Sequence, residues 1–310
     1  MATPTLQLGA MNFGGRTVEA EAIGIVRRAL ELGIDFIDTA NAYNQGESER
    51  IVGRALGADR PKVRIATKVG FGSTRGKPEG LSAAVVVRSL EESLQRLGTD
   101  YVDVYYLHVP DPKTPIEETL EALGTVLSRG LARSWAVSNY ASWQILEMLQ
   151  LAPEFGLPAP VLSQQIYNLL IRQLDVEYAR FAAKYSLATC IYNPLAAGLL
   201  TGKHTRGEIP KGSRFDKNPF YQKRYLYDVT FEHVKALGEL AQEHGLSLVD
   251  LSYAWLNHRD VVSAVIVGPG SVAHLEAAHA GLQKRLEPEV LARIDALSIA
   301  FRGTDVNYAR

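Results

Sequence analysis

Short apolar segments rich in β-forming residues alternate with amphipathic helical segments along nearly the whole chain, and this alternation limits the possible folds more than any other feature. The strand candidates lie at residues 6–14, 36–40, 63–69, 101–108, 132–139, 161–167, 187–193 and 263–268. Helical patterns lie between them, for example at 19–33, 82–98 and 114–130. Strands that alternate with helices form a parallel sheet, which is either open and doubly wound or closed into a barrel.

The barrel fits this chain better than the open sheet. An open sheet that binds a dinucleotide carries GxGxxG after its first strand, and this chain has no such motif there. No linker divides the 310 residues. We therefore predict one (β/α)₈ TIM barrel domain over residues 1–310, with its active site at the C-terminal face of the strands. The segment at about 201–227 has no strand pattern and is rich in Gly, Pro, basic and aromatic residues, which predicts a binding loop or lid.

Charge and composition exclude several classes of function. The formal net charge is −1 with both signs mixed, which gives no electrostatic basis for binding nucleic acid or an anionic membrane. The single cysteine, Cys190, lies in an apolar strand pattern and predicts a buried apolar residue. The seven histidines lack ligand spacing, so no metal site is expected. Neither a secretory signal nor a membrane-spanning segment is recognisable, and we expect a cytoplasmic protein.

Polar side chains stand at the ends of most predicted strands. They are Asp38, Lys68, His108, Ser138 with Asn139, Gln164 and Asn193. Each alone is compatible with a structural role, such as a helix cap, a solvated strand end or a hydrogen-bonded core histidine. In a barrel, however, all of them would converge on one mouth, and this convergence predicts a site.

Three of these residues, together with Tyr43, have the chemistry that carbonyl reduction needs. Reduction requires a hydride donor and an acid that protonates the forming alkoxide. A tyrosine such as Tyr43 has a reference pKa of about 10, and an ammonium group such as that of Lys68 is expected to lower this pKa. A buried ammonium needs a partner such as the Asp38 carboxylate. His108 can hold the carbonyl oxygen by a hydrogen bond.

The segments FIDTANAY, IATKV, YVDVYYLH, WAVSNY, SQQIYNLL and NPLAAGLLTGK resemble the signatures of the aldo-keto reductase superfamily, in that family's order. The resemblance implies that Asp38, Tyr43, Lys68 and His108 are catalytic, with Asp38 also beside the cofactor. It further implies that Ser138, Asn139 and Gln164 hold the nicotinamide carboxamide and that Tyr167 stacks on the nicotinamide ring. Gln165 is an alternative to Gln164, but the Gln-x-x-Tyr spacing favours Gln164. The segment from Asn193 to Lys203, which includes Pro194, Leu195 and Gly198, would pass the pyrophosphate.

A narrower resemblance connects SRFDKNPFYQKRYLY and the ending NYAR to the aflatoxin-aldehyde and succinic-semialdehyde reductase branch. It implies that Arg214 and Arg224 contact the cofactor, that Tyr221 faces the substrate and that Arg310 binds a substrate carboxylate. The alternative for Arg310 is a frayed, solvated terminus. By analogy with this branch, a homodimer is expected.

The segment expected to bind the adenine end departs from that branch. GPGSVAHLEAA follows the last strand, with Ala278 where the branch has asparagine. Gly268, Gly270, Ser271 and His274 remain as candidate cofactor contacts, because amides that open a helix at Ser271 can hold an anion. NADPH is the predicted cofactor and NADH is the alternative.

The sequence therefore predicts an NADPH-dependent reductase that converts small-molecule aldehydes, including carboxylated or dicarbonyl ones, to alcohols. One alternative is an NAD(P)-dependent aldose or alcohol dehydrogenase on the same barrel. The other is a cofactor-binding regulatory subunit of the potassium-channel β type.

Overall fold

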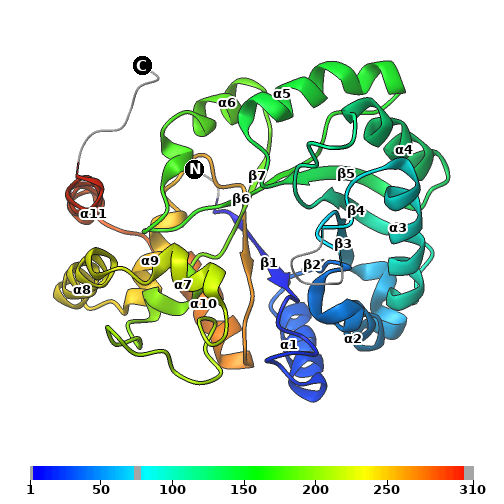
Figure 1. Ribbon diagram of the computed structural model, residues 1–310. Helices are drawn as coiled ribbons and strands as arrows, with labels where there is room; N and C mark the ends of the chain where they lie inside the picture. Colours follow the sequence, from blue (N-terminus) through cyan, green and yellow to red (C-terminus); the bar gives the residue numbers. More distant parts are fainter. Residues whose placement is uncertain (1–2, 73–77, 304–310) are drawn as a thin grey trace.

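The protein is a closed parallel barrel. The computed structural model describes residues 3–72 and 78–303. The strands of this described part pair in chain order: β1 (Thr5–Gly9), β2 (Phe36–Asp38), β3 (Arg64–Val69), β4 (Val102–Leu107), β5 (Ala132–Ser138), β6 (Ser163–Ile166), β7 (Thr189–Tyr192) and β8 (Ala264–Val267). Pairing of β8 with β1 closes the barrel (Figure 1). The predicted (β/α)₈ barrel is confirmed.

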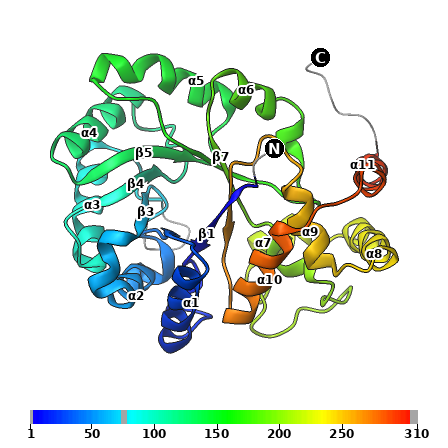
Figure 2. The ribbon, with the colours of Figure 1, turned by 180° about the vertical axis from the view of Figure 1, so that it is seen from behind.

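Helices surround this barrel on the outside, as Figures 1 and 2 show from opposite sides. Between the first seven strands lie α1 (Glu19–Glu31), α2 (Glu47–Leu56), α3 (Ala83–Leu97), α4 (Ile116–Ser128), α5 (Ser142–Leu151) and α6 (Tyr178–Lys184). Between β7 and β8 lie α7 (Pro219–Tyr225), α8 (Asp228–Glu243) and α9 (Leu248–Leu256), and β8 is followed by α10 (Val272–Gln283) and α11 (Pro288–Arg302). Short 3₁₀ turns join some elements: η1 (Tyr43–Gly46), η2 (Gly57–Lys62), η3 (Ala152–Phe155), η4 (Gln173–Asp175) and η5 (Ala196–Thr201).

The helix α3 illustrates how the sequence specifies the outer layer. Its buried residues Val86, Leu90, Leu94 and Leu97 recur every three or four positions, which places them on the face that packs against the barrel. The helix ends at Gly98, whose φ of 64° is a left-handed conformation that glycine adopts without steric cost. Among helices of the described residues, none is both long and apolar enough to cross a bilayer.

The long segment between η5 and α8 folds back onto the barrel. It contains the short helix α7, and the side chains of Phe215 and Tyr225 are fully buried. Phe215 and Tyr225 also pack edge to face, with ring centroids 6.5 Å apart. These aromatic residues therefore anchor the segment and position the polar side chains between them.

A buried ion pair joins α2, β3 and α3 directly behind the barrel wall. The Glu49 carboxylate has no exposed surface and accepts hydrogen bonds of 2.5 Å from both Thr67 Oγ1 and Arg96 Nε. Arg96 retains 17% exposure, which moderates the cost of losing its partner. We expect Glu49→Gln to lower the free energy of unfolding by about 2 kcal/mol, below the values for fully buried pairs. Urea denaturation measures this effect.

Glu92→Gln is the matched control, because Glu92 approaches the same Arg96 at 3.8 Å from an exposed position. An exposed pair contributes about 0.5 kcal/mol or less. Equal losses in the two variants would contradict the assignment of stability to the buried carboxylate.

Candidate active site

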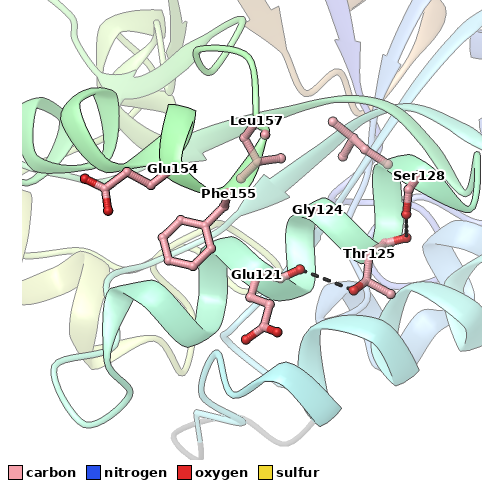
Figure 3. Close-up of a pocket in the computed structure, with 9 residues that line it drawn as sticks. Glu121, Gly124, Thr125, Ser128, Glu154, Phe155 and Leu157 are labelled. Atoms are coloured by element: carbon pink, nitrogen blue, oxygen red, sulfur yellow. Dashed lines mark hydrogen bonds between the residues drawn. The ribbon is translucent and has the colours of Figure 1, made fainter.

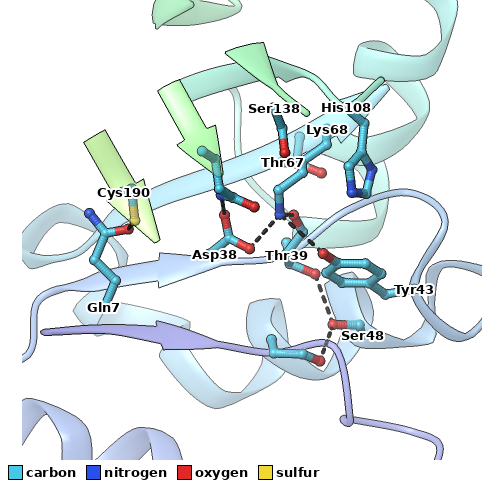
Figure 4. A network of polar contacts seen from close by, with 12 residues as sticks. Gln7, Asp38, Thr39, Tyr43, Ser48, Thr67, Lys68, His108, Ser138 and Cys190 are labelled. Atoms are coloured by element: carbon cyan, nitrogen blue, oxygen red, sulfur yellow. Dashed lines mark hydrogen bonds and ion pairs between the residues drawn. The ribbon is translucent and has the colours of Figure 1, made fainter. Parts of the chain in front are cut away.

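Two of the predicted strand-end side chains, Asp38 and Lys68, meet Tyr43 at the C-terminal end of the barrel (Figure 4). Lys68 Nζ donates hydrogen bonds to Asp38 Oδ1, to the carbonyl oxygen of Thr39 at 2.7 Å and to Tyr43 Oη at 3.3 Å. Asp38 is the last residue of β2, Lys68 lies near the end of β3, and Tyr43 begins η1. The ammonium group of Lys68 therefore lies between a carboxylate and a phenol.

The Lys68–Asp38 pair is almost completely removed from water, with side-chain exposures of 0% and 3%. Burial lowers the pKa of Lys68, and the negative charge of Asp38 opposes this shift. The second oxygen of Asp38 accepts a hydrogen bond from Gln164 Nε2 at 2.9 Å. Both carboxylate oxygens of Asp38 therefore have a hydrogen-bond donor, as a buried carboxylate requires.

The environment of Tyr43 corrects one sequence expectation. The sequence predicts that Lys68 lowers the pKa of this phenol, but the pKa lies well above 10. Burial is the largest cause, and the negative charge of Asp38 adds to it. Tyr43 therefore keeps its proton at neutral pH, and the Lys68 ammonium is placed to stabilise the phenolate after that proton has left.

His108 follows β4 and faces the same mouth. Its ring packs edge-on against Tyr43, at 5.8 Å between centroids, and against the half-exposed Phe71, at 4.6 Å. Burial, followed by the positive charge of Lys68, moves the pKa of His108 well below 6.5. Its Nδ1 is buried and has no hydrogen-bond partner within the described residues. A neutral imidazole is therefore present beside the phenol.

Ser138 and Asn139 lie where the chain leaves β5. Asn139 has a φ of 65°, and its amide nitrogen donates to His108 O at 3.0 Å and to Ser138 Oγ at 3.1 Å. Its amide oxygen accepts a hydrogen bond of 2.7 Å from Tyr192 Oη. Gln165, the alternative to Gln164, instead donates to Tyr140 O and Ser163 Oγ. Gln164 is therefore the glutamine that reaches Asp38.

The prediction that Tyr167 stacks on a cofactor ring is wrong. Tyr167 has no exposed surface, its ring packs against Trp255 with centroids 5.0 Å apart, and its hydroxyl interacts with Asp175 and Arg259. The chain has already left β6 at this residue, so the side chain is directed into the packing against α9. A ring in this position has no face available to a ligand.

Tyr192 is an aromatic residue at the mouth that the sequence reasoning did not single out. It ends β7 and is partly exposed; burial raises its pKa to about 12, and the nearby charge of Arg224 opposes this shift. Its position could have indicated a site residue from the sequence alone, because Tyr192 precedes Asn193 at a strand end just as Ser138 precedes Asn139.

The segment from Asn193 to Lys203 forms a tight turn at the barrel mouth. Asn193 Oδ1 accepts a hydrogen bond from the Ala197 amide at 2.6 Å, and Asn193 Nδ2 donates to Tyr225 Oη at the same distance. Gly198 has a φ of 103°, a conformation that strongly favours glycine. Pro194 is buried, Leu195 and Gly198 are partly exposed, and Lys203 is exposed.

Arginine side chains gather around Tyr221. The guanidinium carbons of Arg214 and Arg224 lie 5.5 and 5.8 Å from the centroid of its ring, and Arg214 Nη1 lies 3.6 Å from Met11 Sδ. Arg16, which the sequence reasoning missed, donates from Nη2 to Asn12 Oδ1 at 2.6 Å. Burial and the nearby charge of Arg214 lower the pKa of Arg16 to about 10.

These three arginines form no ion pair with any carboxylate of the described residues, which leaves their positive charge available to an anion.

The predicted adenine segment opens α10. Ser271 is the N-cap residue, and its Oγ accepts a hydrogen bond from the His274 amide at 3.3 Å. Gly268 and Gly270 are exposed, and Ala278 is fully buried. Because Ala278 is buried, the position at which the resembled branch has asparagine faces the core in this protein.

One pocket lies apart from this mouth. A pocket of about 600 Å³ is formed by α4 and the η3 region, and its lining residues include Glu121, Ser128, Phe155 and Leu157 (Figure 3). None of the predicted site residues lines this pocket. The predicted carboxylate ligand Arg310 lies outside the described residues. Within those residues, no cluster of His, Cys, Asp and Glu could hold a metal ion.

The mouth fits a nicotinamide dinucleotide. An adjacent phenol and imidazole, the partly exposed ring of Tyr192, guanidinium groups without an ion-pair partner among the described residues, and the glycine turn at Gly198 suit a flat ring and phosphates.

Comparison with known proteins gives consistent results. Residues 5–299 match the model of the aldo/keto reductase family. The chain is 36% identical to a probable voltage-gated potassium channel subunit beta from Oryza sativa subsp. japonica, over 94% of this chain and 92% of that protein. It is 34% identical to human aldo-keto reductase family 7 member A3, over 97% of this chain and 94% of that protein. It is also 34% identical to L-glyceraldehyde 3-phosphate reductase from Escherichia coli (strain K12), over 88% and 82%.

Proposed function

Because this chain belongs to the aldo/keto reductase family, we propose that it reduces aldehydes to alcohols with NADPH and with Tyr43 as the general acid. Membership confirms the resemblance seen in the sequence and makes the chain an NAD(P)H-dependent oxidoreductase. The main support for Tyr43 as the general acid of aldehyde reduction is the position of the Lys68 ammonium group, which lies between Asp38 and the Tyr43 hydroxyl.

The roles of the four residues follow from their positions. The nicotinamide, when bound, supplies the hydride. His108, neutral at physiological pH, donates a hydrogen bond to the carbonyl oxygen of the substrate. Tyr43 transfers its proton to that oxygen as the alkoxide forms. Lys68 stabilises the resulting phenolate, and Asp38 keeps Lys68 charged inside the barrel.

We assign cofactor contacts to three groups of residues. Asp38, Ser138, Asn139 and Gln164 would surround the nicotinamide, and Tyr192 would take the stacking role first given to Tyr167. The turn with Asn193, Pro194, Leu195, Gly198 and Lys203 would pass the pyrophosphate. Arg214 and Arg224 would contribute positive charge to the 2′-phosphate site. The start of α10, with Gly268, Gly270, Ser271 and His274, would hold the adenosine phosphate.

The substrate proposal is an aldehyde with an anionic group. Arg16 reaches the side chain of Asn12 in the β1–α1 loop and is close enough to Tyr221 for the two side chains to interact electrostatically. Arginine binds carboxylate and phosphate groups through paired hydrogen bonds. We propose that Tyr221 and Arg310 complete this substrate site. We also propose that the protein is cytoplasmic and, by analogy with the branch it resembles, a homodimer.

Arg214 tests the cofactor assignment. If Arg214 contacts the 2′-phosphate, Arg214→Ala should weaken NADPH binding by about tenfold or more and NADH binding much less, because only NADPH carries this charge. Fluorescence titration with each cofactor measures both affinities, and Arg27→Ala on the exposed face of α1 is the charge-matched control. Equal losses for the two cofactors would mean that Arg214 does not contact the 2′-phosphate.

The proposed reaction is tested by the loss of nicotinamide absorbance. The purified protein is mixed with succinic semialdehyde or with its neutral amide, each with NADPH and with NADH. Rapid consumption of NADPH that favours the carboxylate supports the whole proposal. Equal rates for acid and amide would remove the anionic substrate and leave the reductase.

The names of some relatives favour a second candidate, a cofactor-binding subunit of a channel. Tight NADPH binding without turnover of any aldehyde or sugar would favour this candidate over the reductase. Oxidation of sugars without reduction of aldehydes would instead favour a dehydrogenase.

A further inference from the structure

The loop that follows Tyr43 has an unusual backbone. Asn44, Gln45 and Gly46 are successive residues in the left-handed region, with φ values of 49°, 59° and 81°. Residues other than glycine rarely adopt this conformation, although asparagine does so more readily than most. Interactions around the loop must therefore hold it in place.

The side chain of Asn44 supplies such an interaction. Its Nδ2 donates hydrogen bonds to the carbonyl oxygens of Met11 at 3.1 Å and Phe13 at 2.7 Å. These carbonyls belong to the β1–α1 loop. The contact leaves no room for a side chain at Gly15, where a Cβ would lie 2.7 Å from Asn44 Oδ1. The amide of Asn44 therefore joins two loops of the barrel mouth directly.

Hydrogen bonding holds the Tyr43 side chain only weakly. Among the described residues, the hydroxyl of Tyr43 has one hydrogen-bond partner, Lys68 Nζ at 3.3 Å. That contact is at the long end of the hydrogen-bond range, so it does not fix the ring by itself. The β1–α1 loop also carries Met11, which contacts Arg214, so the same amide connects Tyr43 to the arginine side of the mouth.

We propose that Asn44 is a positioning residue for the reaction: its side-chain amide holds the Tyr43 loop against the β1–α1 loop and thereby sets where the Tyr43 hydroxyl lies relative to Lys68. The inference rests on the proposed function, because it assumes that Tyr43 is the acid. Asn44 itself touches no reacting group in this role. Small displacements of an acid have large effects on rate, because proton transfer requires precise alignment.

Two neighbouring glycine substitutions separate the amide from the backbone. Asn44→Gly keeps the left-handed conformation accessible and removes the amide. Gln45→Gly makes the same backbone change one residue later, where no side-chain hydrogen bond within the described residues is lost. Both positions are exposed, so folding should survive in both variants.

We expect Asn44→Gly to lower kcat by about tenfold, with cofactor affinity and KM for the aldehyde within about twofold of wild type. The solvent deuterium isotope effect on kcat should increase, because proton transfer from a displaced Tyr43 becomes slower. Hydrogen exchange should increase in peptides that cover residues 10–17. Gln45→Gly should resemble wild type in every measurement.

Unchanged kcat in Asn44→Gly would overturn the inference, even if hydrogen exchange increases. Equal losses in both variants would also overturn it, because the effect would then come from glycine flexibility. A wild-type protein that reduces no carbonyl is a different result, since it removes the proposed function itself and the inference with it.

Discussion

Replacing Tyr43 with phenylalanine should reduce kcat by a factor on the order of 10² or more, the usual contribution of a positioned acid. The variant loses only the hydroxyl, so the ring still packs edge-on against His108 and the loop geometry is retained. Cofactor affinity should remain nearly unchanged. Steady-state rates with a saturating aldehyde, combined with fluorescence titration of NADPH, measure the two effects separately.

Tyr185→Phe is a suitable control, because Tyr185 lies on the outer surface with 39% exposure. A fully active Tyr43→Phe protein would remove Tyr43 from the mechanism. In the wild type, the raised pKa of Tyr43 also predicts the pH dependence. A phenol whose pKa lies above 10 holds its proton at higher pH, so this group should cause no loss of reductive turnover between pH 7 and 9.

The positions of the strand-end residues could be predicted from the sequence because they follow from topology. Parallel strands in a closed barrel bring their C-terminal ends together whatever the details of packing. Asp38 and Lys68 lie within or at the end of strands, and the register of β2 with β3 determines their proximity. The alternation of strands and helices along the sequence was therefore enough to predict this part of the site.

The direction of a side chain beyond a strand end could not be predicted in the same way. Tyr167 follows the end of β6 and is buried against Trp255, whereas Tyr192 is still the last residue of β7 and faces the mouth. The strict alternation of side chains ends where the ladder ends. The shift in the Tyr43 pKa had a similar origin, because the depth of burial depends on the surrounding loops.

Lys68→Met tests whether the positive charge, rather than the shape of the site, supports the reaction. Methionine fills a similar volume but cannot stabilise a phenolate, so turnover should fall on the order of 10². The substitution also leaves Asp38 buried. Among the side chains of the described residues, Gln164 is then its remaining hydrogen-bond donor. An unpaired buried carboxylate is destabilising, and thermal unfolding should occur at a lower temperature.

The double variant Lys68→Met, Asp38→Asn separates these effects, because asparagine removes the unpaired charge and still accepts the hydrogen bond from Gln164. We expect the double variant to recover much of the lost stability and none of the turnover. Recovery of both would show that the single variant was inactive because its structure was disturbed. Wild-type rates for Lys68→Met across the pH range would contradict the ammonium–phenol pairing itself, because the Tyr43 phenolate would then form without the charge that is 3.3 Å from its oxygen.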